Sequence, residues 1–259
     1  MKRNKQILML AVAFVFASFF SAGMLWAMSH EIVTEEVRYH EKMKDVKGFL
    51  ARPADNEKHP ALVLIHEWWG LNDNIRENAR QFAKLGYVAL AVDLYQGQVA
   101  ADRKEARKLA TGVRKNRGPA FENLKQAVAY LKGRSANVEP QRVASVGWCF
   151  GGGWSYQMAK NDLGVKATVI YYGRFNPKDD LSRMRATIIG HFGEKDRGIK
   201  VDKVREFQAR LKTLKGDHEI YIYPNAGHGF ANPGGGKRYN KEATEDAWKR
   251  TTAFLKKYL

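Results

Sequence analysis

The hydrophobic positions of this chain form short compact runs that are separated by longer amphipathic segments. Ala61 to Ile65 and Tyr87 to Val92 are apolar without alternation, which is typical of strands buried on both faces of a parallel sheet. Between them, Asn72 to Leu85 has helical spacing and ends at Gly86, a common C-terminal stop for a helix. The strand, helix and strand together predict a βαβ unit.

The same alternation continues to the end of the chain, after a predicted hairpin near its start. The expected hairpin strands are 31–40 and 47–52, the later strands 142–147, 167–172, 187–192 and 218–223, and the later helices 103–114, 121–132, 154–160, 201–214 and 243–258. The pattern predicts a single three-layer α/β domain with ligands at the carboxyl ends of its strands. The Gly234 to Gly236 run is expected to be a flexible surface loop.

The first residues depart from this pattern and predict a leader. Basic residues precede an apolar stretch from Ile7 to Ala27 that contains no charged side chain. The stretch is long enough to span a bilayer, because a membrane helix needs about 20 apolar residues. Residues 1–27 are therefore expected to be a signal peptide or a membrane anchor, and 28–259 the globular domain. We expect a protein of the bacterial periplasm, either soluble or tethered through residues 7–27.

Composition and charge narrow the functional classes. The chain is 44% hydrophobic and 27% charged, as an ordinary globular domain is, and its formal net charge is +17. The basic residues are scattered along helical segments such as Arg103 to Arg117, and no nucleic-acid-binding motif accompanies them. We therefore interpret the charge as a solvated surface and expect a monomer without a nucleic-acid partner. The alternatives are steering of an acidic substrate or adhesion to an anionic membrane.

The sharpest local signal is the run Gly147-Trp148-Cys149-Phe150-Gly151-Gly152, placed between a predicted strand and a predicted helix. It is typical of a nucleophile elbow, in which small residues on either side let the nucleophile occupy a strained turn. Cys149 is the only cysteine, so it cannot form an internal disulfide. The positive end of the following helix would favour a thiolate, and the Phe150 amide could face an oxyanion. The alternative is a buried core thiol.

Two later loops supply a base and an acid in the order that a hydrolase triad requires. His228 lies among small residues after the last predicted core strand, and Asp196 follows the strand before it. Glu194 is a rival for the acid, whereas His191, inside an apolar strand, is expected in the core. A surface histidine is the alternative for His228.

The segment from His66 to Gly70 ends the first core strand, where a second oxyanion amide is expected, and we assign it to Trp68. The segment is not a zinc signature, because the position four after His66 is Gly70 rather than a second histidine. No metal or cofactor is therefore expected. Glu67 is a candidate catalytic residue, with a structural ion pair as its alternative.

These motifs resemble the dienelactone hydrolase family: a Gly-x-Cys-x-Gly-Gly elbow, a glutamate at the edge of the first strand, Asp-Leu-Tyr after the second, and Ala-Gly-His-x-Phe near the end. The similarity spans roughly Val46 to Leu259. The resemblance implies an α/β-hydrolase fold and an ester-bond hydrolase of the carboxymethylenebutenolidase type. It also implies a triad of Cys149, Asp196 and His228, and a Glu67 that helps to activate the thiol when substrate binds.

The sequence departs from the resemblance at two positions. The best-known members hold a substrate carboxylate with two arginines, and the matching positions are Gly97 and Asn232. Replacement charges are available on other loops, at Arg174, Lys237 or Arg238. The pocket is expected to be aromatic, with Trp148, Tyr171 and Phe230 as candidate substrate-binding residues or, alternatively, as core packing.

The function that these residues predict is the opening of lactones or the cleavage of activated esters through an acyl-cysteine intermediate. A thiolate is a good leaving group, so enol lactones, thioesters and activated esters are favoured over amides. The alternatives are a carboxylesterase or thioesterase of the cell envelope, and a binding protein that retains the fold without turnover.

Overall fold

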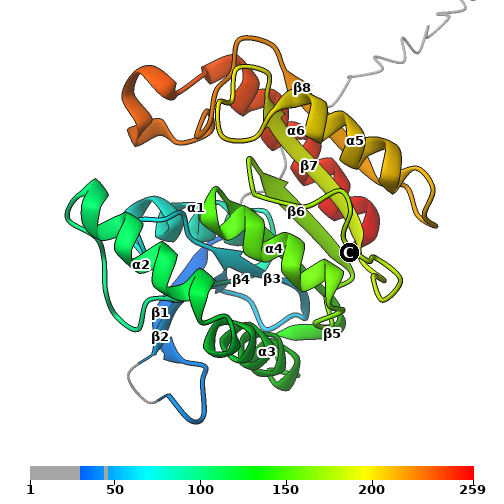
Figure 1. Cartoon of the computed structure of the whole chain (residues 1–259). Coiled ribbons are helices and arrows are strands. Elements are labelled where there is room, and N and C mark those ends of the chain that lie inside the picture. The colour runs from blue at the N-terminus through cyan, green and yellow to red at the C-terminus, as the bar shows by residue number, and fades with distance from the viewer. Residues whose placement is uncertain (1–29, 44–45) are drawn as a thin grey trace, which may run out of the picture.

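The computed structural model describes residues 30–43 and 46–259, and within them eight strands form one sheet (Figure 1). The strands lie in the order β1-β2-β4-β3-β5-β6-β7-β8, and the six from β4 to β8 are parallel. β1 and β2 pair antiparallel at one edge, as the predicted hairpin required. The bounds are β1 Ile32–Arg38, β2 Lys47–Pro53, β3 His59–Ile65, β4 Val88–Val92, β5 Val138–Trp148, β6 Ala167–Tyr171, β7 Thr187–Gly193 and β8 Glu219–Tyr223.

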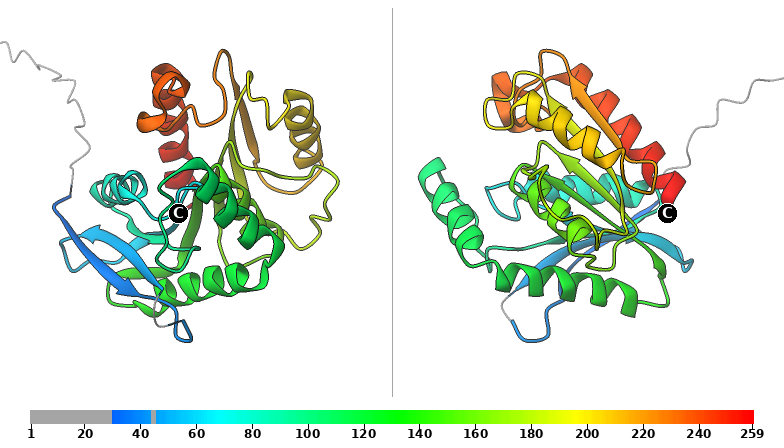
Figure 2. Two further views of the ribbon diagram at one scale, coloured as in Figure 1. Left: turned by 60° about the vertical axis from the view of Figure 1, so that its left-hand side comes forward. Right: turned by 45° about the vertical axis from the view of Figure 1, so that its right-hand side comes forward.

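Helices cover both faces of the sheet and complete three layers (Figure 2). The apolar faces of α1 (Asp73–Lys84) and α6 (Lys241–Tyr258) join one buried cluster. Those of α3 (Gly118–Gly133), α4 (Phe150–Lys160) and α5 (Val201–Leu211) join the cluster on the opposite face. The three-layer α/β architecture predicted from the alternation is confirmed, and so is the α/β-hydrolase fold that the resemblance implies.

Helix α2 (Arg103–Lys115) differs from the others in how little of it is buried. Only Ala106 and Ala110 are fully inside the protein, while its basic side chains are exposed. Asp102 caps its N-terminus by accepting from the Glu105 N–H at 2.8 Å. The helix is therefore held by its cap, by these two alanines and by the partly buried Leu109 and Val113, not by a deep apolar face.

The parallel register brings the functional loops to one edge of the sheet. Ile65 of β3 pairs with Gly147 of β5, and Trp148 pairs with Tyr171 of β6. The carboxyl ends of neighbouring strands consequently lie side by side, which is where ligands bind in such sheets.

Several predicted boundaries need correction. β5 begins at Val138 rather than at 142, and α4 begins at Phe150, directly after the cysteine, rather than near 154. Three of the first four residues of α4 are glycine, a weak helix former, and they obscured the helical pattern. The helix predicted for 201–214 ends at Leu211. The expected loop at Gly234 to Gly236 lies within a 3₁₀ helix, η1 (Pro233–Arg238), which the Asn232 side chain caps.

The leader predicted at residues 1–27 lies outside the described residues. Among the helices that the structure describes, none combines the length and the apolar character needed to span a membrane.

Candidate active site

Cys149 occupies a strained turn between β5 and α4, with φ 53° and ψ −110°. A Cβ on Gly147 would lie 2.1 Å from the Gly151 carbonyl oxygen, and one on Gly151 would lie 2.1 Å from the Ile65 carbonyl oxygen. No real Cβ tolerates such contacts with the main chain, so both positions require glycine. The backbone thus has the geometry of a nucleophile elbow, which holds the thiol at the edge of the sheet.

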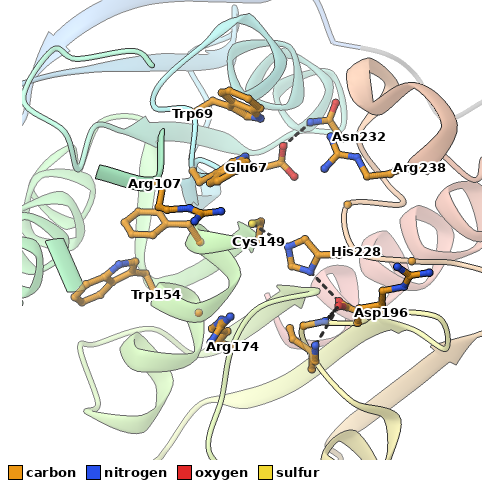
Figure 3. A pocket seen from close by; sticks show the side chains of 18 of the residues that line it. Glu67, Trp69, Arg107, Cys149, Trp154, Arg174, Asp196, His228, Asn232 and Arg238 are labelled. Atoms are coloured by element: carbon orange, nitrogen blue, oxygen red, sulfur yellow. Dashed lines mark hydrogen bonds and ion pairs between the residues drawn. The ribbon is translucent and has the colours of Figure 1, made fainter. Parts of the chain in front are cut away.

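The structure brings three of the predicted side chains into one hydrogen-bonded line (Figure 3). The Cys149 Sγ lies 3.0 Å from His228 Nε2, and His228 Nδ1 lies 2.8 Å from Asp196 Oδ2. The other carboxylate oxygen of Asp196 accepts from the N–H groups of Gly198 at 2.7 Å and Ile199 at 3.0 Å. These two amides fix the carboxylate, which in turn fixes the orientation of the imidazole.

The electrostatics of this line favour a protonated imidazole. Burial lowers the pKa of His228, but the hydrogen bonds and charges of Asp196 and Cys149 outweigh it and raise the pKa to about 10. Burial likewise acts to raise the pKa of Asp196, and its bonds to His228 and the two amides bring it below its usual value. The arrangement can therefore hold a proton on the imidazole next to the sulfur.

The rivals considered from sequence lie elsewhere. Glu194 is exposed and accepts only a long bond from the Asn225 N–H, at 3.4 Å. His191 is fully buried and contacts the hydroxyls of Tyr223 and Thr251, each at 3.0 Å. Burial lowers the pKa of His191 to about 3, so it is a neutral core histidine, as predicted.

The two predicted oxyanion amides border the same cavity as the thiol. Phe150 is the first residue of α4, and Trp68 lies in the loop after β3. Within residues 30–43 and 46–259, neither amide N–H has a protein acceptor. Both donors are thus available to a ligand.

Glu67 points into the same site, but its partner is not the sulfur. The Asn232 side chain donates to its Oε2 (Figure 3). Burial raises the pKa of Glu67, and this hydrogen bond, together with the charges of His228 and Arg238, opposes the rise only in part. Asn232, one of the two departures noted from sequence, is therefore built into the site through Glu67.

The cavity in front of Cys149 has a volume of about 1020 Å³ and differs from the predicted pocket in its lining. Trp148, Tyr171 and Phe230 do not line it, so their prediction as substrate-binding residues is corrected. All three are buried in the cluster under α1 and α6, and the Tyr171 hydroxyl bonds Thr251 at 2.8 Å. Side chains alternate across a strand or turn, so residues next to a motif can face the opposite layer.

The aromatic lining comes instead from Trp68, Trp69, Phe150 and Trp154. Among the suggested replacement cations, Arg174 and Arg238 line the cavity, whereas Lys237 does not. Sequence reasoning missed the further lining arginines Arg107, Arg114, Arg117 and Arg197. The available signal is the basic segment from Arg103 to Arg117, interpreted above as a solvated surface.

Similarity to known proteins agrees with this architecture. The model of the dienelactone hydrolase family matches residues 46–259. A Saccharolobus solfataricus protein named "Putative carboxymethylenebutenolidase" is 32% identical over 259 residues, covering 86% of this chain and 98% of the relative. "Protein usf" of Aquifex pyrophilus is 32% identical over 230 residues, with the same two shares.

Solved structures show the same fold. That of a dienelactone hydrolase-like promiscuous phosphotriesterase from metagenomic libraries superposes with a TM-score of 0.79 at 22% identity, covering 88% of this chain and 98% of that one. Taken with the family match over most of its length, these similarities identify the chain as an ester-bond hydrolase that belongs to the dienelactone hydrolase family.

Proposed function

We propose that this hydrolase opens lactones or cleaves activated esters through a covalent acyl-cysteine intermediate, with Cys149 as nucleophile, His228 as base and Asp196 as the orienting acid. The observation that carries the proposal is the continuous line from Sγ through the imidazole to the carboxylate, at 3.0 and 2.8 Å. Both distances are within the reach of proton transfer.

The first half of the reaction forms the acyl-enzyme. In the proposed resting state the thiol proton is already on His228 Nε2, so Sγ attacks the carbonyl carbon as a thiolate, and the carbonyl π electrons move to oxygen. The N–H groups of Phe150 and Trp68 stabilise that oxyanion. When the carbon–oxygen bond to the leaving group breaks, Nε2 returns the proton to the departing oxygen.

The second half releases the acid. Water takes the place of the leaving group, His228 accepts one of its protons, and the hydroxyl oxygen attacks the acyl carbon. The carbon–sulfur bond then breaks, which releases the acid and leaves the Cys149 thiolate beside the protonated imidazole. Because a thiolate is readily expelled from a tetrahedral intermediate, the chemistry favours enol lactones, thioesters and aryl esters over amides.

Hydrolysis of a substrate panel tests this proposal directly. The full-length chain in a mild detergent is compared with its Cys149→Ala variant on enol lactones, aryl esters and thioesters. We expect the variant to lose activity on every substrate. We also expect mass spectrometry of the wild-type protein, quenched during turnover, to find the acyl group on Cys149. Equal rates for the two proteins would refute the nucleophile assignment and favour a binding protein that retains the fold.

We further propose that residues 1–27 direct the protein out of the cytoplasm of a bacterium, with the enzyme domain in the periplasm. The support is the uninterrupted apolar stretch from Ile7 to Ala27 after a basic start. Residues 1–40 fused to alkaline phosphatase, which is active only after export, should give an active reporter. A fusion that starts at residue 28 is the control, and equal activity of both would contradict export.

A further inference from the structure

Arginines surround the cavity and outnumber its carboxylates. The lining arginines are Arg107, Arg114, Arg117, Arg174, Arg197 and Arg238. Among the lining residues that the structure describes, the only carboxylates are Glu67 and Asp196, which are bonded to Asn232 and His228. The excess of positive charge therefore remains available to a ligand.

Three of these arginines form a wall on one side, which we call the α2–α3 wall: Arg107 and Arg114 of α2, and Arg117 at the N-cap of α3. The guanidinium of Arg114 lies 5.6 Å from the ring centre of Phe150, and that of Arg117 lies 5.5 Å from the ring of Trp154. In the described part of the chain, none of the three lies within 4.0 Å of a carboxylate oxygen. The aromatic rings hold Arg114 and Arg117 at the wall without neutralising their charge.

The wall faces the acyl side of a bound ester. His228 returns its proton to the leaving oxygen in the proposed reaction, so the leaving group must lie beside the imidazole. In Figure 3, Arg107 and Trp154 lie on the other side of Cys149 from His228. The acid portion of the substrate therefore extends toward the α2–α3 wall.

We propose that the acid portion of the substrate carries at least two negative charges, which the α2–α3 wall binds. The inference rests on the proposed function and adds to it a substrate class: esters or lactones of acids with two or more further carboxylates or comparable oxyanions. One carboxylate pairs bidentately with a single guanidinium, so three unpaired arginines match more than one anionic group. Gly97 and Asn232, which match the carboxylate-binding arginines of the best-known members, carry no charge. The proposed anion site lies on the α2–α3 wall instead.

A series of 4-nitrophenyl esters with one leaving group tests the charge requirement. The acids are butyric acid, glutaric acid and tricarballylic acid, the last esterified at a terminal carboxyl, so that the acyl parts carry zero, one and two negative charges. Because the arginines are exposed, we expect kcat/KM to rise about two- to fivefold with each charge. The advantage should shrink as the salt concentration rises from about 0.02 M to about 0.5 M.

Two variants of equal charge locate the effect. R107Q/R114Q/R117Q removes the wall, and R103Q/K108Q/K115Q removes three cations of the same helix that do not line the cavity. We expect the first variant to lower the ratio of kcat/KM between the tricarballyl and butyryl esters about tenfold. The control variant should keep the wild-type ratio, since it changes the net charge but not the cavity.

The outcomes separate this inference from the proposed function. Hydrolysis that depends on Cys149 but shows no preference along the ester series would overturn the anionic substrate and leave the thiol mechanism intact. An equal loss of preference in both triple variants would show that net charge, not the wall, attracts the substrate, and would also overturn the inference.

Discussion

Replacing Asp196 with asparagine should stop catalysis while it preserves the geometry of the site. The carboxylate accepts two backbone N–H bonds on Oδ1 and the imidazole on Oδ2. An asparagine keeps its oxygen toward the amides of Gly198 and Ile199, because these groups can only donate. Its NH₂ group must then face His228 and donate to Nδ1. The ring is forced into the tautomer that carries hydrogen on Nε2, which cannot accept the thiol proton.

The size of the effect follows from this reversal of one hydrogen bond. The same substitution in a Ser-His-Asp triad lowers kcat by about 10⁴ through the wrong tautomer, which corresponds to about 5 kcal/mol of barrier. We expect a loss of about 10³ to 10⁴ here. Stability should change by only about 1 kcal/mol, because every bond keeps a partner, whereas Asp196→Ala leaves two N–H groups without an acceptor and should cost about 2–3 kcal/mol.

The assay is kcat/KM for 4-nitrophenyl butyrate over a range of pH, with urea denaturation in parallel. The matched control is Asp180→Asn, since Asp180 is exposed and also accepts a backbone N–H in its loop. The control should resemble the wild-type protein in both measurements. If Asp196→Asn keeps its rate within about threefold while Cys149→Ala is inactive, the tautomer argument is wrong.

Three further outcomes follow from the described contacts. Gly151→Ala should lower the free energy of unfolding, measured by urea denaturation, by about 3 kcal/mol or more, because its Cβ would lie 2.1 Å from a main-chain oxygen. Its control is Gly112→Ala, which has no neighbour within 4 Å and should stabilise α2 by about 0.5–1 kcal/mol. Tyr171→Phe should lower the free energy of unfolding by about 1 kcal/mol and leave KM unchanged, since the hydroxyl bonds a buried partner outside the cavity; a raised KM would restore its substrate-binding role. The raised pKa of His228 contributes stability that is complete below pH 6.5 and is lost as the pH rises through about 10, so the free energy of unfolding should fall across that range in the wild-type protein and less in His228→Ala.

The sequence was sufficient for the layers of the fold because each element carries its own periodic signal. The apolar strand runs and the helix stops identify the βαβ alternation without reference to tertiary contacts. The errors occurred where that signal is weak. Glycines at the start of α4 weaken the helical pattern of its first turn. The helix η1 depends on a cap from Asn232, which a hydrophobic periodicity cannot predict.

The residues proposed for the chemistry were accessible from sequence because their order and spacing are properties of the fold. Cys149, Asp196 and His228 each follow the carboxyl end of a strand or lie in a loop after one, so the parallel register alone brings them together. The lining of the cavity was not accessible in this way. Trp148 directly precedes Cys149, but its side chain packs in the cluster under α1 and α6 and not in the cavity. Neighbouring residues of a strand point to opposite faces of the sheet, so closeness in sequence does not predict the lining.

The division between chemistry and recognition has a structural basis. A Cβ added at Gly147 or Gly151 would lie 2.1 Å from a main-chain oxygen, so the elbow leaves no room for any residue but glycine at these two positions. The α2–α3 wall, by contrast, stands on a helix with only two fully buried alanines, where a charge can be added or removed without disturbing the core. The proposed anion site on α2 can therefore change its preferred anion independently of the residues proposed to attack the ester.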